Sequence, residues 1–208
     1  MKYTAREKHA NIISDFLIFL NKVTDKFVLK GGTALAKCYN LDRFEDIDLD
    51  SEKGNITSIV KNYCKSKNFT YCEKKNTSYG QRFMIDYKVD RQLLKVEVRL
   101  NEKINKDDVC KINGIIVYKI NRLTLMKLQA YDSRDKIRDM YDIAFIINNY
   151  WDSLNEVIWK IIALSFENKG LEHFDYLIKQ QKDDLIDTKN FLEKTLIAFN
   201  KVEEFSRK

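Results

Sequence analysis

The sequence predicts an α+β fold in which strands and helices are mixed up to about residue 120 and only helices follow. Three observations support this prediction. A short apolar strand runs into two glycines and a helix, apolar and polar residues alternate in several segments between residues 46 and 120, and the hydrophobic period becomes helical after Asn121. We therefore expect two regions, 1–120 and 121–208, forming two lobes of one body with a cleft between them.

The elements of the first region follow from changes of hydrophobic period. Apolar side chains recur at helical spacing near residues 5–22, and a strand at 27–30 ends at Gly31-Gly32, before a helix at 33–38. Strict alternation at 46–50 predicts a half-buried strand, and 56–65 reads as a helix. The remaining strands are predicted at 69–72, 83–89, 93–100 and 115–120. The helices of the second region are predicted near 122–133, 138–149, 153–168, 171–181 and 188–205.

The composition excludes several classes of protein. With 208 residues, of which 44% are hydrophobic, the chain can bury a core and is too apolar to be disordered. No apolar run approaches the roughly 18 residues of a membrane span, and charges occupy the start of the chain where a signal peptide would be apolar, so we expect a cytoplasmic protein that does not bind a membrane.

Cysteine and histidine are too few and too scattered for a zinc site. The four cysteines form no C-x-x-C pair and there are two histidines, so metal chemistry would use carboxylates, which favour Mg²⁺ or Mn²⁺. The net charge of +6 is compatible with a polyanionic partner such as RNA, although many basic proteins bind none.

The glycine pair is the first candidate for a functional element. Gly31 and Gly32 lie between a strand and a helix, where the backbone can approach a ligand closely and where the helix, from Thr33, directs N–H groups and a positive dipole end toward it. This arrangement can cradle a phosphate. An ordinary strand-to-helix turn is the alternative interpretation.

Acidic residues on the next strand are the second candidate. Alternation places Asp46, Asp48 and Asp50 on one face of the strand, and two carboxylates at this spacing repel each other unless a divalent cation binds both. The alternative is a solvated strand face. Glu97, on the predicted strand 93–100, is the expected third carboxylate, with Asp86 as a fallback. Because Glu97 shares its face with basic residues, a salt-bridged exterior strand competes with the catalytic interpretation.

Together these motifs predict a phosphate cradle beside a two-metal site, which suits transfer of a nucleotidyl group. The segments Gly31-Gly32-Thr33-Ala34-Leu35 and Arg43-Phe44-Glu45-Asp46-Ile47-Asp48-Leu49 resemble the nucleotidyltransferase toxins of the AbiEii/AbiGii abortive-infection family, within the polymerase-β-like superfamily. Later segments, Lys127-x-x-Ala130 with Arg134 and Arg138-Asp139-x-x-Asp142, are similar to that family's later motifs. Many family members carry a Ser or Thr between the arginine and the acids, and this chain does not.

The resemblance implies a polymerase-β-like fold with a mixed sheet and a helical C-terminal lobe. It also implies a toxin of a toxin–antitoxin or phage-defence pair, which transfers a nucleotide from an NTP to an RNA, presumed to be tRNA, with Mg²⁺ (or Mn²⁺) as the cofactor and a cognate antitoxin as a partner. Within this interpretation Gly31, Gly32 and Thr33 bind the triphosphate, and Asp46, Asp48 and Glu97 bind the metal ion.

The later motifs supply the remaining candidate residues. On a continuous helix Lys127, Tyr131 and Arg134 share one stripe, which Arg138 would extend, and such a stripe can bind a triphosphate or an RNA backbone. The resemblance implies that Lys127 acts in catalysis and nucleotide binding, and that an aspartate of the later motif, Asp142 in preference to Asp139, acts in catalysis. A solvated helix face and a structural network of ion pairs are the respective alternatives.

Two other functions remain open from the sequence. A metal-dependent glycosyltransferase can also use Asp-x-Asp, although its nucleotide-binding region ordinarily needs more chain before the motif. A catalytically inactive nucleotidyltransferase fold that binds RNA or protein is the second, and the complete acidic and glycine motifs argue against it.

Overall fold

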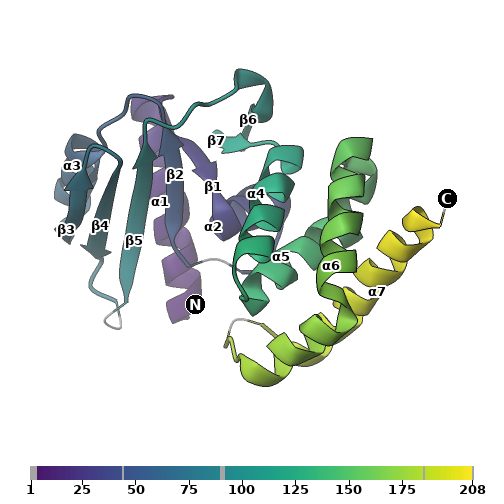
Figure 1. Cartoon of the computed structure of the whole chain (residues 1–208). Helices are drawn as coiled ribbons and strands as arrows, with labels where there is room; N and C mark the ends of the chain where they lie inside the picture. The colour runs from purple at the N-terminus through teal and green to yellow at the C-terminus, as the bar shows by residue number, and fades with distance from the viewer. Residues whose placement is uncertain (1–3, 44, 90–91, 185, 208) are drawn as a thin grey trace. The chain divides into compact units, whose positions relative to one another are not determined.

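The computed structural model describes residues 4–43, 45–89, 92–184 and 186–207 (Figure 1). Phe44, in the turn before the acidic strand, lies outside the described residues. The chain divides into two compact units, Met1–Tyr118 and Lys119–Lys208.

A mixed seven-stranded sheet forms the body of the first unit, in the order β3-β4-β5-β2-β1-β7-β6. β2 is parallel to β5 and antiparallel to β1, and β1 is parallel to β7, so strands from three separate chain segments meet at the centre. The strands are β1 Val28–Lys30, β2 Ile47–Ser51, β3 Thr70–Thr77, β4 Gly80–Asp86, β5 Leu93–Leu100, β6 Val109–Ile112 and β7 Ile115–Tyr118.

Helices α1 and α3 pack on one face of this sheet, behind it in Figure 1. The helices of the unit are α1 Ala5–Val23, α2 Gly31–Tyr39 and α3 Thr57–Lys67, with the 3-10 turn η1 Lys106–Asp108. Phe16 of α1 and Tyr63 of α3 meet edge to face at 5.0 Å between ring centroids, and Ile47 and Leu49 of β2 are buried on this face. Because side chains alternate along a strand, the acidic residues of β2 project from the opposite face.

The described residues of the C-terminal unit form four longer helices and one short 3-10 turn. They are α4 Ile120–Ser133, α5 Ile137–Tyr150, η2 Trp151–Ser153, α6 Glu156–Gln180 and α7 Thr188–Ser206. Gly170 has φ 61° inside α6 and kinks the helix, at the boundary between the two helices predicted there.

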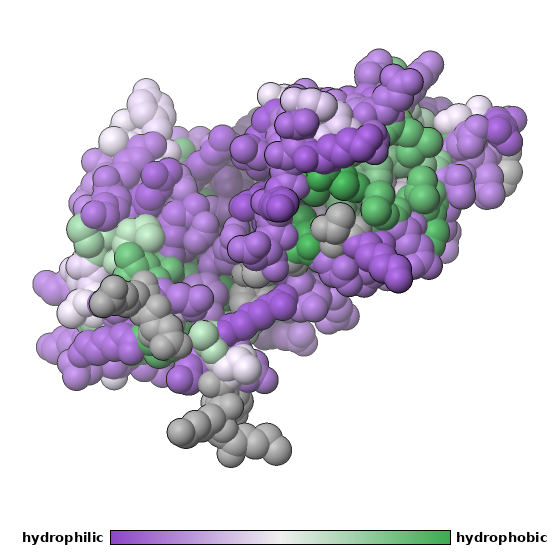
Figure 2. All heavy atoms as spheres, turned by 90° about the horizontal axis from the view of Figure 1, so that it is seen from below, coloured by the Kyte–Doolittle hydropathy of each residue, from purple (hydrophilic) through white to green (hydrophobic). Residues whose placement is uncertain are grey.

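Hydrophobic side chains reach the surface over the C-terminal helices (Figure 2). α6 exposes Val157, Leu164 and Leu171 at a spacing of seven residues, and α7 exposes Leu192 and Leu196. None of the helices formed by the described residues has the length and apolar character that a membrane crossing requires.

Several predicted elements have different limits in the structure. β3 runs from Thr70 to Thr77, beyond the predicted end at residue 72. All of its side chains are exposed, so its sequence carries no apolar alternation from which its length could be predicted. β4 begins at Gly80 and ends at Asp86, so both of its ends lie three residues before those of the predicted strand, 83–89. The short strand β6 was missed, and α2 begins at Gly31, two residues before the predicted start.

Candidate functional site

The junction between β1 and α2 places a glycine against a carboxylate. Gly31 begins α2 directly after Lys30, the last residue of β1. Its backbone has φ +76°, a conformation that residues with a Cβ rarely adopt. A Cβ at this position would lie 3.1 Å from Oδ2 of Asp48. Glycine is therefore required here both for the turn and for the close approach of Asp48 to the start of the helix.

The start of α2 is suited to bind an anion. The first amides of an α-helix have no partner within the helix, and no described side chain caps α2. The hydroxyl of the buried Thr33 donates to the backbone carbonyl of Asp46, which ties the first turn of α2 to the segment that enters β2. Thr33 can thus offer its backbone N–H to a phosphate, while its hydroxyl holds the two motifs together.

Four charged residues form a row across adjacent strands. Asp48 on β2 is the register partner of Lys30 on β1 and of Glu97 on β5, and Glu97 is in turn the partner of Arg82 on β4. Neighbouring strands are about 4.8 Å apart, so the side chains of Asp48 and Glu97 are neighbours on one face of the sheet. The structure thus brings together two acids that are 49 positions apart (97 − 48) in the chain.

Burial and neighbouring acids raise the pKa of Asp48. Loss of hydration is the largest cause, the charges of Asp46 and Glu97 add to it, and the charges of Lys95 and Lys30 oppose it. A divalent cation beside Asp48 would remove this penalty, since it would replace the missing hydration of the carboxylate by direct ligation.

Basic side chains accompany the other two acids. Lys95 Nζ lies 2.7 Å from Oδ2 of Asp46 and 3.7 Å from Oε2 of Glu97, and the Arg82 guanidinium is 2.8 Å from Oε1 of Glu97. Burial would raise the pKa of Glu97, but the hydrogen bond and charge of Arg82, with Lys95 and Lys75, bring it below the ordinary value. A lowered pKa favours the ionised carboxylate, which is the form that binds a cation. Glu97 thus forms the ion pairs that the salt-bridged strand, the alternative to a catalytic role, would have.

The donor chemistry fits magnesium, but the carboxylates are not gathered around one point. Among the described residues, no group of three or more His, Cys, Asp or Glu side chains is arranged to hold a metal ion. Asp46, Asp48 and Glu97 supply only oxygen ligands, which Mg²⁺ prefers, and the Lys95 ammonium lies between two of them. These three residues could hold the ion once Lys95 moved aside.

Asp50, the third acid of the alternating run, has a different role. It is 3% exposed, pairs with Lys30 and accepts a hydrogen bond of 3.0 Å from the Tyr118 hydroxyl. Asp50 therefore joins β2 to β1 and β7 through buried contacts. Lys30 and Tyr118 were not singled out in the sequence, because neither belongs to a recognisable motif and only the sheet order brings them to Asp50.

The fallback acid, Asp86, lies away from the row. Its register partner on β5 is Leu93, four positions before Glu97, and its Oδ1 accepts a hydrogen bond of 2.8 Å from the amide of Lys88. Four residues of a strand span about 13 Å, so Glu97 and not Asp86 is the acid beside Asp48.

Lys127 and Asp142 form an ion pair in the C-terminal unit. Lys127 comes from α4 and Asp142 from α5, and their side chains are 12% and 0% exposed. A carboxylate this deeply buried stabilises the neighbouring ammonium and fixes its position. The pairing joins α4 to α5 through a buried contact.

The predicted basic stripe on α4 is wrong beyond its first residue. Tyr131 is completely buried and α4 ends at Ser133, so Arg134 has an extended backbone and leaves the helical face. Arg134 forms two hydrogen bonds with the buried Asp139, at 2.7 and 3.0 Å. Arg138 lies 3.2 Å from Asp183. These contacts match the network of ion pairs that the sequence left open for this segment.

A mixed sheet with a glycine turn and carboxylates on adjacent strands, followed by a helical unit, is the arrangement expected of a nucleotidyltransferase, and the family match assigns the chain to this class. The model of the AbiEii nucleotidyl transferase toxin family, of type IV toxin–antitoxin systems, matches residues 18–201. The chain belongs to this family, which implies an NTP substrate and an antitoxin partner.

Two solved structures from Helicobacter pylori share the fold. The protein JHP933 is 24% identical with a TM-score of 0.75, and the match covers 100% of this chain and 95% of JHP933. A candidate nucleotidyltransferase from H. pylori is 25% identical with a TM-score of 0.74, and the match covers 96% of each chain. No match was found among curated proteins.

Proposed function

We propose that this chain transfers a nucleoside monophosphate from an NTP to an RNA acceptor, tRNA, with Mg²⁺ as the cofactor. The observation that carries the proposal is the close approach of Asp48 to Gly31, where a Cβ would lie 3.1 Å from the carboxylate. It places the start of a helix, which favours anions, beside a carboxylate that is costly to bury without a cation. The activity would take place in the cytoplasm, as the toxic arm of an abortive-infection or related toxin–antitoxin pair.

The residues of the first unit divide between phosphate and metal. The first-turn amides of Gly31, Gly32 and Thr33 would bind the triphosphate, and Asp46, Asp48 and Glu97 would hold Mg²⁺. When bound, the ion would neutralise charge that develops on the reacting phosphoryl group and the pyrophosphate. Glu97, whose carboxylate is paired with Arg82, would also take the proton from the attacking hydroxyl.

In the C-terminal unit we assign Lys127 to nucleotide binding, as the family's later motif implies. Asp142 acts through Lys127, because the buried carboxylate holds the ammonium in one position. Arg134 and Arg138 are assigned to nucleotide or RNA contacts only secondarily, since each already pairs with an aspartate.

The test is incubation with each α-labelled NTP, Mg²⁺ and total bacterial tRNA. We expect label in the RNA, and we expect its loss in Asp48→Asn, because an amide cannot replace a carboxylate as a metal ligand of full charge. Asp86→Asn is the matched control, since Asp86 is on the same sheet face but outside the row of Asp48 and Glu97, and it should retain activity.

Full transfer by a folded Asp48→Asn protein would refute the assignment of the site. A parallel assay of nucleotide-sugar hydrolysis measures the glycosyltransferase alternative, and we expect no turnover there.

A further inference from the structure

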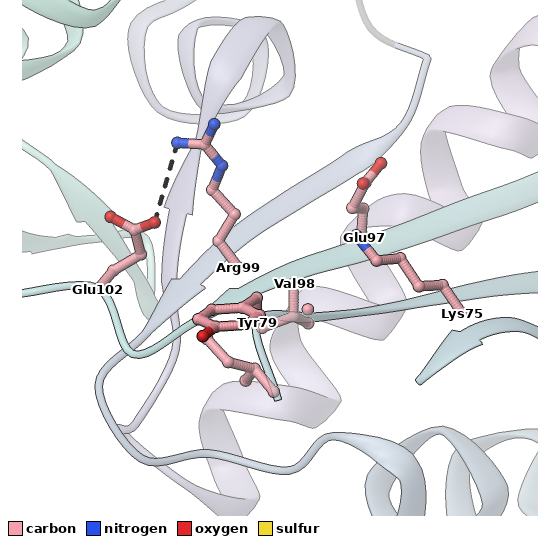
Figure 3. A pocket seen from close by; sticks show the side chains of 8 residues that line it. Lys75, Tyr79, Glu97, Val98, Arg99 and Glu102 are labelled. Carbon is pink, nitrogen blue, oxygen red and sulfur yellow. Dashed lines mark ion pairs between the residues drawn. The ribbon is translucent and has the colours of Figure 1, made fainter. Parts of the chain in front are cut away.

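A polar pocket opens beside Glu97 at the hairpin that joins β3 to β4 (Figure 3). It has a volume of about 470 Å³ and is lined by Lys75 of β3, Tyr79 of the hairpin turn, and Glu97 and Arg99 of β5. In Figure 3 the Lys75 side chain extends toward Glu97. The pocket therefore shares one residue with the row of charged groups on the sheet.

The order of the strands places this pocket on a defined side of the reaction. From β1 across β2 to β5, the sheet carries the start of α2 at Gly31, then Asp48, then Glu97, and the pocket lies beyond Glu97. In an in-line displacement the attacking hydroxyl and the leaving pyrophosphate lie on opposite sides of the phosphorus. With the triphosphate at the start of α2 and its leaving group toward that helix, the hydroxyl would approach from the side of β5 and the β3–β4 hairpin, where the pocket is.

The lining of the pocket suits a single strand of nucleic acid. The side chain of Arg99 is 68% exposed and lies 3.9 Å from Glu102, a long contact that leaves its guanidinium accessible to a phosphate. Tyr79 is 76% exposed at the tip of the hairpin, so its ring is accessible to a planar partner. Cationic side chains beside an exposed aromatic ring are the combination with which proteins bind unpaired nucleotides.

We propose that this pocket binds the 3′-terminal nucleotides of the RNA acceptor, with the 3′ hydroxyl at Glu97, backbone phosphates at Lys75 and Arg99, and a base stacked on Tyr79. The inference rests on the proposed function and names the acceptor subsite of the same site. In the reaction, the 3′ oxygen forms a bond to the α-phosphorus and the bond from that phosphorus to pyrophosphate breaks. The proton of the 3′ hydroxyl passes to the carboxylate of Glu97.

The test measures binding of a short, fluorescently labelled single-stranded RNA to the full chain, by anisotropy. Tyr79→Ala should weaken this binding roughly 5- to 100-fold, the loss of one stacked base, and Tyr79→Phe should restore it because the ring is retained. The paired change Lys75→Gln with Arg99→Gln should reduce the slope of log affinity against log salt by about 1.4, for two phosphate contacts on a single strand. All the changed side chains except Lys75 are more than half exposed, and thermal melting confirms folding of each variant.

Matched controls come from exposed residues outside the pocket. Tyr176→Ala changes a tyrosine that is 54% exposed on α6, and Lys61→Gln with Lys65→Gln removes two charges from α3, which lies on the other face of the sheet. Neither should change RNA affinity. In the transfer assay, Tyr79→Ala should raise KM for RNA and leave KM for NTP unchanged.

Two results overturn the inference, and they are distinguishable. If the wild-type chain transfers nucleotides to RNA but the Tyr79 and Lys75/Arg99 variants bind RNA like the controls, the pocket assignment alone is wrong. If the wild-type chain labels a protein or no acceptor at all, the proposed function fails and the acceptor subsite fails with it.

Discussion

Replacement of Gly31 by alanine perturbs the proposed site through a single methyl group. The new Cβ would meet Oδ2 of Asp48 at 3.1 Å, so the carboxylate must move by a few tenths of an ångström. The backbone would also have to keep φ at +76°, which costs a residue with a Cβ about 1–2 kcal/mol. The substitution thus combines a stability cost with a displacement of one proposed metal ligand.

The two effects have separable magnitudes. A loss of about 1–2 kcal/mol lowers the melting temperature of a domain of this size by about 3–10 °C. A shift of about 1 Å in a catalytic group can reduce the rate about 100-fold, so a smaller shift of Asp48 should reduce transfer on the order of 10-fold.

Gly114→Ala is the control for the backbone term. Gly114 has φ +82°, in the turn between β6 and β7, and a Cβ there would meet nothing within 4 Å. Both variants should therefore melt earlier by a similar amount, measured by thermal unfolding, while only Gly31→Ala loses nucleotidyl transfer at a temperature where both are folded. Equal activity of the two variants would refute the reasoning that the glycine is required for the position of Asp48.

Three further predictions concern buried or shared charges. Lys95→Met should tighten Mn²⁺ binding in the absence of nucleotide at least about fivefold, measured by electron paramagnetic resonance, because an ammonium no longer competes for the carboxylates; unchanged affinity would contradict this. Tyr118→Phe removes a hydrogen bond to the buried Asp50 and should lower the free energy of unfolding by about 1.5–3 kcal/mol in denaturant titrations, with transfer activity retained. Lys127→Met should lower the free energy of unfolding by about 3–5 kcal/mol, because the buried Asp142 loses its cation. Adding Asp142→Asn should recover stability but not transfer activity. Recovery of both would show that the pair has a purely structural role.

Much of the fold follows from hydrophobic period alone. The strand at 93–100 is found at Leu93–Leu100, and the helix at 188–205 is found at Thr188–Ser206, because each has a strong period that its burial satisfies. The exposed strand β3 and the short strand β6 carry no such pattern. Their pairing depends on backbone hydrogen bonds to a neighbouring strand, which no local sequence pattern records.

The motifs of the candidate site could also be predicted from the sequence, because they depend on local patterns. Gly31 and the alternating acids at Asp46 and Asp48 are local features, since a turn conformation and a strand face depend on adjacent residues. The prediction that Lys127 and Arg134 share one helical face was wrong, because it assumed that the helix continues past Ser133, where α4 ends. Where a helix ends is decided partly by contacts such as that of Arg134 with Asp139.

The sequence by itself determined the chemical character of this protein: a glycine turn, an acidic strand, and membership of a nucleotidyltransferase family that the ordered motifs already indicated. The tertiary structure alone decided which acid accompanies Asp48, which basic side chains neutralise the row, and that Asp50 is bound to Lys30 and Tyr118. The physical reason is that strand order brings together residues far apart in the chain, and charge interactions depend on distance in space and not on separation in sequence.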